Sequence, residues 1–375
     1  MTMSLAPGAW PADRAGATLT IDLAAIAANY RLLGERAAGA VCAPVVKADA
    51  YGLGAARVAP VLEAAGARDF FVAHVDEGIA LRRYVSPDVR ITILHGPRPG
   101  AVDDCVRHDL RPVLNSMEQL ASWRQAAGRH GRRLAAALQV DSGMSRFGLS
   151  PHDVRAIAAD RSLLAGIDTD LVISHLACAD DPANPASAAQ RAQFRHLASM
   201  LPRAPLSLAA SSGIFLGEGY HFDLVRPGAA LYGVAPTAAA PNPLHPVVRL
   251  RAHVMQIRDI APGDGVGYGL TYRAAAPRRI ATIATGYADG FARQGASRGC
   301  AWLDDIRLPV VGRISMDSLA LDISDVPDSR LSPDMTVDLI GPRRGVDAVA
   351  EAAGTIGYEI LTALGHRYHR DYIAA

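Results

Sequence analysis

The sequence has little cysteine, almost no net charge and no long apolar run. Its four cysteines form no CxxC pair, so they suggest neither a disulfide framework nor a zinc site, and they fit reduced thiols in a cytosol. Lysine and arginine together number 38 against 37 acidic residues, and a net charge of +1 is too small to attract nucleic acid or an anionic membrane. No stretch is apolar enough to span a bilayer or to act as a secretory signal. We therefore expect a cytoplasmic protein that binds small neutral or zwitterionic molecules and no metal.

The length of 375 residues exceeds what one ordinary core accommodates, so two domains are expected. Half of the residues are hydrophobic, which is enough to build both cores. Residues 1–16 combine prolines and charges without a periodic pattern, and we interpret them as a loose N-terminal tail.

Residues 17–240 alternate short apolar runs with helical patterns. The runs include "LTIDL", "VCAPVV", "FFVAHV", "ITILHG", "LAAALQV" and "LVISHLA", and their near-continuous apolar character is typical of buried parallel strands. The number of repeats is close to eight, and no GxGxxG opens the first crossover, which favours a (β/α)8 TIM-type barrel over a doubly wound sheet. The Ala- and Pro-rich residues 235–246 are interpreted as a linker.

Residues 246–375 have a different pattern, in which polar and apolar residues alternate between Gly, Pro and Asp breaks. Segments such as "VVRLRAHVMQIRDI" and "IRLPVVGRISMDSLALDI" predict antiparallel strands with one exposed face. The spacing of alanines and leucines in "AVAEAAGTIGYEILTALGHRY" predicts a helical C-terminus. The fold class expected is thus α/β, a barrel followed by a mainly β domain.

Lys47 stands at the end of an apolar run in "VVKADAYGLG", residues 45–54. In a barrel this position lies at the mouth formed by the C-terminal ends of the strands, where active sites are built. A lysine that loses water there has a lowered pKa and can attack a carbonyl to form a Schiff base. From the strand pattern alone, a lysine that merely extends to solvent from the strand end is an equally open interpretation.

Three further segments follow predicted strands at the same mouth. "VDSGMSRFG" places Arg146 in a Gly-containing loop, and "SSGIFLG" and "VRPGAALYG" supply hydroxyls and glycine-opened amides of the kind that bind phosphate. Each segment by itself is more typical of an ordinary turn than of a ligand site.

Taken together and in order, these segments closely resemble alanine racemase. The resemblance extends from about residue 18 to the C-terminus and rests on "VKADAYGLG", "AHVDEGIALR", "VDSGMSRFGL", "SHLACAD", "VRPGAALYG", "VGYGLTY", "ATGYADG", "GRISMD" and "GYEIL". It implies a pyridoxal 5'-phosphate (PLP) enzyme made of a barrel and a C-terminal β domain, although a shared scaffold does not by itself fix the substrate.

The resemblance also implies a role for each matching residue. Lys47 holds the cofactor and serves as the base on one face of the substrate, and Tyr268, from the partner subunit of a homodimer, is the base on the other face. Arg226 faces the pyridine nitrogen and, because an arginine keeps its proton, leaves that nitrogen unprotonated. The remaining matches are Tyr51, Ser211, Gly228, Ala229 and Tyr358 for the phosphate, His175 beside the ring, and Arg146 and Met316 for the substrate carboxylate.

Without the resemblance, several of these residues have ordinary structural explanations. Tyr268 fits an exposed aromatic side chain in a glycine-rich turn, and Arg226 fits a partner for a helix C-terminus. His175 is consistent with a core histidine, and Met316 with a buried filler.

Four positions depart from the pattern of the family. Ala210 replaces an asparagine ahead of the phosphate segment, and Gln139 replaces a lysine that some relatives carbamylate beside the Arg146 loop. Because an amide cannot form a carbamate, Arg146 must be held by a direct hydrogen bond, by a small anion, or less firmly. Leu53 and Ser315 replace a histidine and a cysteine, and little effect on chemistry is expected from either.

The resemblance and these residues predict a PLP-dependent racemase that interconverts L- and D-alanine, with D-alanine as a peptidoglycan precursor if the source is bacterial. Two other interpretations stay open. One is a different reaction on the same scaffold: racemisation of serine, lysine or arginine, or a decarboxylation, which the presence of both Lys47 and Tyr268 disfavours. The other is a non-catalytic PLP-binding protein, which would need no C-terminal domain with substrate residues.

Overall fold

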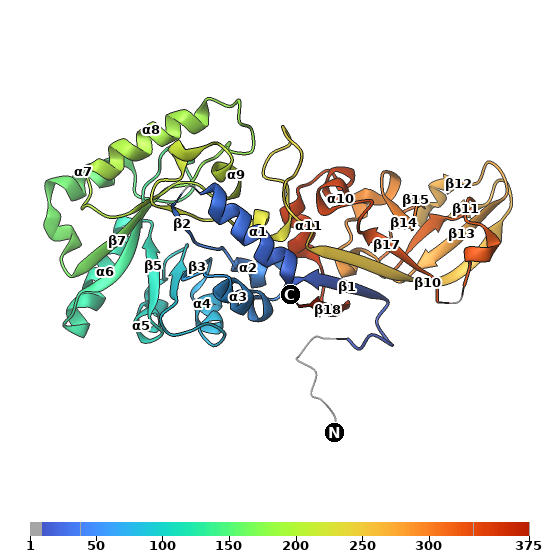
Figure 1. The fold of residues 1–375 in the computed structure, drawn as a ribbon, viewed down its shortest axis with the longest axis horizontal. Helices are drawn as coiled ribbons and strands as arrows, with labels where there is room; N and C mark the ends of the chain where they lie inside the picture. The colour runs from blue at the N-terminus through green and yellow to red at the C-terminus, as the bar shows by residue number, and fades with distance from the viewer. Residues whose placement is uncertain (1–9, 38, 333, 375) are drawn as a thin grey trace, which may run out of the picture. The chain divides into compact units, whose positions relative to one another are not determined.

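The computed structural model describes residues 10–37, 39–332 and 334–374, which form two compact units (Figure 1). Of these described residues, those within 26–245 form one unit, and those within 10–25 and 246–374 together form the other. Residues 1–9 of the predicted tail lie outside the described residues, whereas Arg14 and Ala15 donate backbone hydrogen bonds to Pro11 in a turn.

The first unit contains a closed ring of parallel strands. A six-stranded sheet, β3 to β8 in chain order, joins a two-stranded sheet of β2 and β9 through bridges from Val45 to Phe71 and from Ala210 to Arg226. The strands are β2 (Val41–Cys42), β3 (Asp69–Val72), β4 (Arg90–Ile93), β5 (Leu110–Leu114), β6 (Leu134–Gln139), β7 (Ile167–Ile173), β8 (Leu206–Ser207) and β9 (Leu224–Val225). This is the expected TIM-type barrel.

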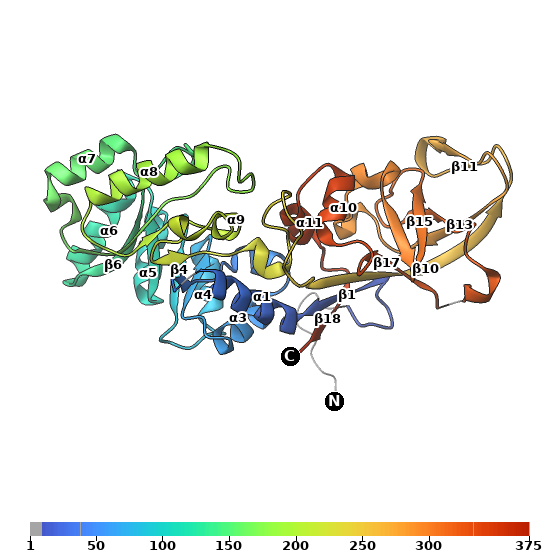
Figure 2. The same cartoon turned by 45° about the horizontal axis from the view of Figure 1, so that its top comes forward.

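Helices follow the strands and surround the ring, as Figures 1 and 2 show for α4 to α8. They are α1 (Leu23–Arg36), α2 (Lys47–Tyr51), α3 (Ala55–Ala64), α4 (Val75–Leu81), α5 (Val102–Arg107), α6 (Met117–His130), α7 (Pro151–Ala159), α8 (Ala186–Ser199) and α9 (Ser211–Ile214). Trp123, Phe194 and Phe71 are among the largest fully buried side chains, and each contributes about 1.5–3 kcal/mol or more by leaving water.

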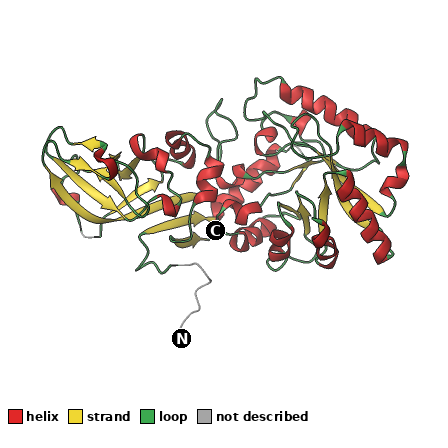
Figure 3. Cartoon of the chain, turned by 180° about the vertical axis from the view of Figure 1, so that it is seen from behind, coloured by secondary structure: helices red, strands yellow, loops and turns green. Residues whose placement is uncertain are grey.

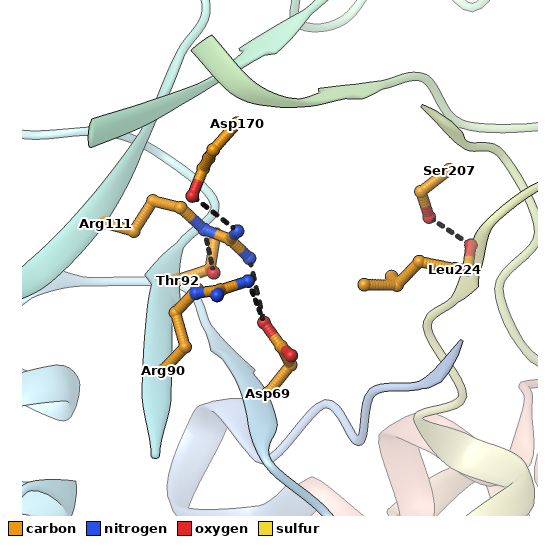
Figure 4. Close-up of polar contacts among 7 residues, drawn as sticks. All are labelled: Asp69, Arg90, Thr92, Arg111, Asp170, Ser207 and Leu224. Atoms are coloured by element: carbon orange, nitrogen blue, oxygen red, sulfur yellow. Dashed lines mark hydrogen bonds and ion pairs between the residues drawn. The ribbon is translucent and has the colours of Figure 1, made fainter. Parts of the chain in front are cut away.

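An ionic network centred on the buried Arg111 lies at the end of the barrel opposite the C-terminal rim (Figure 4). Arg111 of β5 donates to Thr92 at 2.9 Å, to Asp170 at 3.1 Å and to Asp69 at 3.2 Å, and Arg90 also donates to Asp69. These residues come from β3, β4, β5 and β7, so the network joins strands that are not neighbours. Removing one partner of a buried ion pair leaves the other charge buried without a partner, which lowers the free energy of unfolding by about 3–5 kcal/mol.

One strand prediction was wrong. The segment "LTIDL" was expected to begin the barrel, but β1 (Ala17–Asp22) pairs antiparallel with β10 (Val248–Ile260) and parallel with β18 (His369–Ile373) in the other unit. Its side chains alternate between buried and partly exposed, as they do in a sheet with one exposed face, whereas β3 is buried at every position. Lys47 therefore follows the first strand of the barrel and Arg146 follows the fifth.

The second unit is dominated by antiparallel strands, shown in yellow in Figure 3. Besides β1, β10 and β18 it contains β11 (Gly265–Val266), β12 (Tyr272–Arg273), β13 (Arg278–Ile283), β14 (Cys300–Leu303), β15 (Ile306–Val311), β16 (Leu319–Asp322) and β17 (Thr336–Ile340). The long strand β10 pairs with β17 through its first half and with β13 through its second half, which closes the sheet into a ring.

The C-terminal segment is helical as expected, but its last residues are not. Helices α10 (Val346–Ala353) and α11 (Gly357–Ala363) are separated by Gly354, which has the left-handed φ of a helix C-cap. Strand β18 then follows, where the sequence predicted no further element. No helix of the described residues is long and apolar enough to cross a membrane.

Candidate active site

Lys47 lies at the C-terminal end of the first barrel strand and begins an unusual turn. Ala48, Asp49, Ala50 and Tyr51 all have positive φ, between 51° and 56°, so α2 is a left-handed turn built without glycine. This conformation costs roughly 1–2 kcal/mol per residue, and it persists only where surrounding contacts stabilise it. Its presence directly after Lys47 marks the rim as a functional site.

The Lys47 amine is an amine of reduced basicity. Burial lowers its pKa from the usual value, the positive charges of Arg146 and Arg226 lower it further, and the carboxylate of Glu77 opposes them. A larger share of the amine is then unprotonated at neutral pH and able to attack a carbonyl. Lys47 is also the only lysine in the chain, because every other strongly basic side chain is an arginine.

Arg226, at the end of β9, is a fully buried cation. It donates to the backbone oxygens of Ser174 at 2.6 Å and Leu208 at 3.3 Å and to the hydroxyl of Ser207. Burial lowers its pKa to about 10, so it keeps its proton at neutral pH. None of the described carboxylates forms an ion pair with it, which leaves its positive charge to act on whatever occupies the rim.

Ser211, Gly228 and Tyr51 form a small cradle at the same rim. The hydroxyl oxygen of Ser211, the first residue of α9, accepts hydrogen bonds from the amides of Gly228 at 3.0 Å and Ala230 at 3.2 Å. A Cβ at position 228 would clash with the hydroxyl group of Tyr51, so the approach of these two segments requires glycine. Hydroxyls and amides gathered in this way suit a phosphate.

Ala229, which was predicted to share the phosphate contact, begins the turn between Gly228 and Ala230. The amides that donate to the Ser211 hydroxyl are therefore those of Gly228 and Ala230, the two neighbours of Ala229.

His175, just past the end of β7, is a neutral histidine. Burial, together with the charges of Arg226, Arg146 and Lys47, lowers its pKa to about 3. Its backbone is held by Gln190 of α8, whose side chain donates to the His175 oxygen at 3.2 Å and accepts from the Ala177 amide at 2.8 Å. A neutral ring held in this way can lie against an aromatic cofactor without adding charge.

Arg146 is exposed and is held less firmly than the other rim residues. None of the described residues forms a hydrogen bond or ion pair with its guanidinium, which lies 5.9 Å from the centre of the Phe147 ring. Gln139 donates instead to the Phe147 backbone oxygen at 3.3 Å, so its amide does not orient Arg146. Arg146 lines a cavity of about 480 Å³ together with His95 and Asn115.

The other three predicted residues belong to the β unit. Tyr268 opens the 3₁₀ turn Tyr268–Leu270, between Gly267 and Gly269 with positive φ, and it is 70% exposed. Met316 is 53% exposed, and its carbonyl accepts a hydrogen bond from the amide of Ala288. Tyr358 is the second residue of α11.

Sequence reasoning missed the residues that hold the rim through backbone contacts. Glu77 and Gln190 each bond to two or more backbone groups near Lys47 and His175, and no short spacing in the sequence connects them. Tyr232, whose hydroxyl donates to the Val45 oxygen and whose ring lies 4.9 Å from that of Tyr51, was missed for the same reason.

The rim fits a phosphorylated aldehyde. It combines an amine of lowered pKa, a buried guanidinium without an acidic partner among the described residues, and a hydroxyl-amide cradle. The fold and this rim define the class of barrel enzymes that use an aldehyde cofactor.

Comparison with known proteins agrees with that class. Residues 21–236 match the family model "Alanine racemase, N-terminal domain", and residues 247–372 match "Alanine racemase, C-terminal domain". A Mesorhizobium japonicum protein named "Alanine racemase, catabolic" is 54% identical over 97% of this chain and 96% of its own length. An Agrobacterium fabrum protein of the same name is 50% identical over 96% and 93%.

A solved structure supports the same assignment. The Bartonella henselae alanine racemase with covalently bound pyridoxal phosphate is 40% identical, covers 96% of this chain and all of its own, and superposes with a TM-score of 0.92. The chain belongs to the alanine racemase family.

Proposed function

We propose that this protein interconverts L- and D-alanine with PLP, using Lys47 and Tyr268 of the partner subunit as the two bases. The observation that carries the proposal is the position of Lys47, the only lysine, at the barrel rim with a lowered pKa beside the buried Arg226. Membership of the alanine racemase family and the relatives named above support alanine as the substrate.

Each rim residue has a part in holding the cofactor. Lys47 would bind its aldehyde carbon, Ser211, Gly228, Ala229, Tyr51 and Tyr358 its phosphate, and Arg226 its ring nitrogen, with His175 beside the ring. When bound, PLP withdraws electrons from the α-carbon of an attached amino acid and so acidifies the α-hydrogen. Arg226 keeps its own proton at neutral pH, so it donates to the ring nitrogen without protonating it, which favours proton return over side reactions.

The proton transfers belong to two side chains on opposite faces. The Lys47 amine, with its lowered pKa, takes or returns the α-proton on one face. The Tyr268 hydroxyl does so on the other, and Arg146 attracts the substrate carboxylate together with the Met316 backbone amide. Arg146 has room to move because none of the described side chains fixes its guanidinium.

We further propose a homodimer in the cytoplasm. Tyr268, Leu270 and Met316 are large, exposed side chains on the β unit, as expected for groups that complete the site of a second chain. The four free cysteines suit a reducing compartment. Sedimentation across a concentration series would test the dimer, and a monomer with full activity would contradict a shared site.

The reaction is tested by following α-proton exchange in deuterated buffer by NMR, with the purified protein, PLP and a panel of L-amino acids. Exchange of alanine with formation of D-alanine is expected. A preference for serine, lysine or arginine would overturn the choice of substrate, and PLP binding without exchange would leave a non-catalytic binding protein.

Two substitutions of Lys47 make the cofactor assignment sharper. Lys47→Arg keeps a positive charge but cannot bind an aldehyde, and Lys47→Ala removes both, so both variants should lose turnover by at least about a thousandfold. After borohydride reduction, mass spectrometry should find the cofactor on the Lys47 peptide of the wild type and on no peptide of either variant. Full activity in Lys47→Arg would contradict the role of the amine.

The cellular use of the reaction is a second proposal. The names of the two relatives favour degradation of alanine, whereas D-alanine supply for peptidoglycan was expected from the sequence. Disrupting the gene should abolish growth on alanine as carbon source in the first case, and should create a requirement for D-alanine in the second.

A further inference from the structure

A side chain from outside the left-handed turn binds the backbone amide directly after Lys47. The carboxylate of Glu77 accepts a hydrogen bond from the Ala48 amide at 2.7 Å through Oε1. Through Oε2 it accepts from the amides of Ala73 at 2.7 Å and His74 at 3.0 Å. Glu77 therefore joins the residue after Lys47 to the end of the neighbouring barrel strand and to the first turn of its own helix, α4.

The opposite end of the turn has its own contacts. Asp49 accepts a hydrogen bond from the Ala55 amide at 2.7 Å, at the start of α3, and the Gly52 amide donates to the Ala48 oxygen at 2.7 Å. These bonds lie within one stretch of chain. On the other side of Lys47, the Val46 amide donates to the Phe71 oxygen of β3 at 2.9 Å, and Glu77 adds a side-chain link from Ala48 to the end of the same strand.

Glu77 also acts on Lys47 through its charge. Its carboxylate favours the protonated form of the amine and opposes the effect of burial and of the two arginines. The same carboxylate favours the protonated form of His95, whose pKa is lowered mainly by burial. One side chain thus influences both where the backbone of Lys47 lies and how basic its amine is.

We propose that Glu77 is a positioning residue for Lys47. Its carboxylate links the amide of Ala48 to the amides of Ala73 and His74, and this clamp thereby fixes the direction in which the Lys47 side chain points from the rim. This inference rests on the proposed function, because a fixed direction matters only if Lys47 carries the cofactor. It assigns Glu77 no contact with substrate.

The test compares Glu77→Gln and Glu77→Ala with the matched control Asp76→Asn. Glutamine keeps the shape but has one acceptor oxygen for amides that now use two, and alanine has none. Asp76 is an exposed acid in the same first turn of α4, so its substitution removes the same charge from the helix without touching the three amides.

Three measurements on the full chain report the clamp. In the cofactor-free protein, hydrogen exchange in a peptide covering residues 45–54 should be at least about tenfold faster in both Glu77 variants. In the holoenzyme, the PLP dissociation constant should rise about tenfold and kcat should fall about tenfold, with KM changed less than about threefold. Asp76→Asn should match the wild type in each.

A fourth measurement separates positioning from a general loss of structure. The pH dependence of amine modification at Lys47 can be read from its peptide without interference, since the chain has no other lysine. Loss of the Glu77 charge should move the midpoint of this reaction to lower pH in Glu77→Gln. A purely structural role would leave that midpoint where it is in the wild type.

The outcomes distinguish this inference from the proposed function. Wild-type protein without cofactor on Lys47 after borohydride reduction would overturn the function, while the exchange and modification measurements on the cofactor-free chain would still test the clamp. Cofactor on Lys47 in the wild type, with unchanged exchange, kcat and midpoint in Glu77→Gln, would overturn the clamp. Should Glu77→Ala fail to fold, the isosteric glutamine variant decides.

Discussion

Arg226 and Ser211 of the barrel unit are held in the opposite way from Tyr268 and Met316 of the β unit. In the barrel unit, Arg226 and Ser211 are 3% and 4% exposed and are hydrogen-bonded to neighbouring segments. In the β unit, Tyr268 and Met316 are 70% and 53% exposed. The barrel unit therefore presents two buried, hydrogen-bonded site residues, and the β unit presents two exposed side chains on segments between its strands.

This difference indicates where precision and adaptability lie. A cofactor that is held permanently benefits from buried, fixed partners, because little ordering remains to be done on binding. Residues that act on a site in another chain must remain on the surface until the chains assemble. The predictions below test this contrast, from the largest expected effect to the smallest.

Substituting Tyr268 tests the exposed site residues of the β unit. Tyr268→Phe should lower racemisation by about 10²–10³, because the variant lacks the hydroxyl that we propose as the proton acceptor on one face. Deuterium exchange measured separately from L- and D-alanine should be lost from one enantiomer and remain measurable from the other.

The control for that variant is Tyr272→Phe on β12, whose hydroxyl lies 3.5 Å from Asp322 within the same unit. It should leave both exchange rates unchanged. Equal loss from both enantiomers in Tyr268→Phe would argue against a division of labour between two bases.

Substituting Gly228 tests the buried site residues of the barrel unit. Gly228→Ala would drive a Cβ into the Tyr51 hydroxyl, so one of the two segments must shift and the cradle must deform. Overpacking of this kind costs typically about 1–3 kcal/mol, which corresponds to a rise in the PLP dissociation constant of about fivefold to 150-fold.

The comparison variant is Gly128→Ala in helix α6, where an added Cβ meets nothing within 4 Å. It should keep full cofactor affinity and raise the unfolding midpoint slightly, because alanine is the better helix former. Unchanged PLP affinity in Gly228→Ala, measured by titration of the cofactor-free chain, would remove the cradle from the phosphate site.

The buried rim also predicts a pH dependence of stability. His175 titrates near pH 3 in the folded chain but near pH 6.5 when unfolded, so between these values the unfolded chain binds a proton that the native chain does not. Stability of the cofactor-free chain should therefore fall as the pH drops from about 6.5 towards 3.

His175→Gln removes this contribution and should flatten the dependence of the urea midpoint on pH between about 4.5 and 7. His152→Gln, at an exposed position on α7, should retain the wild-type slope. The same slope in His175→Gln would mean that His175 is protonated in the folded protein.

How far the sequence predicts the molecule depends on the kind of contact involved. The barrel was predictable because its strands are mostly apolar and buried, with β3 buried at every position, whereas β1 was assigned to it although Thr18 and Thr20 alternate with buried Ala17, Leu19 and Ile21. That alternation is the pattern of the β unit, to which β1 belongs. Strand β18 was missed because "HRDYI" is polar at the edge of its sheet.

For the site, residue type and order identified the groups at the rim. A count of the lysines would have strengthened the assignment of Lys47. A chain whose other strong cations are all arginines has a lysine only at position 47, which favours a chemical need for an amine over a lysine that merely reaches solvent. The supports of the rim could not be found in this way. Glu77 and Gln190 bind backbone groups, and because every residue type has a backbone, the sequence does not show which backbone group a side chain will bind.

The smallest effect is expected at Gln139, next to the least fixed residue of the rim. Gln139→Lys replaces the bond to the Phe147 oxygen with an amine that can carry a carbamate and so place a negative charge near Arg146. A partly exposed ion pair contributes up to about 1 kcal/mol, so KM for alanine should fall by up to about fivefold while kcat stays nearly constant.

Gln139→Met separates the two causes of such a change, because it also loses the bond to Phe147 but supplies no charge. If only the lysine variant lowers KM, and bicarbonate strengthens the effect, then Arg146 gains by being oriented. If neither variant changes KM, then Arg146 needs no partner at position 139 to bind the substrate, and its cation–π contact with Phe147 orients it sufficiently.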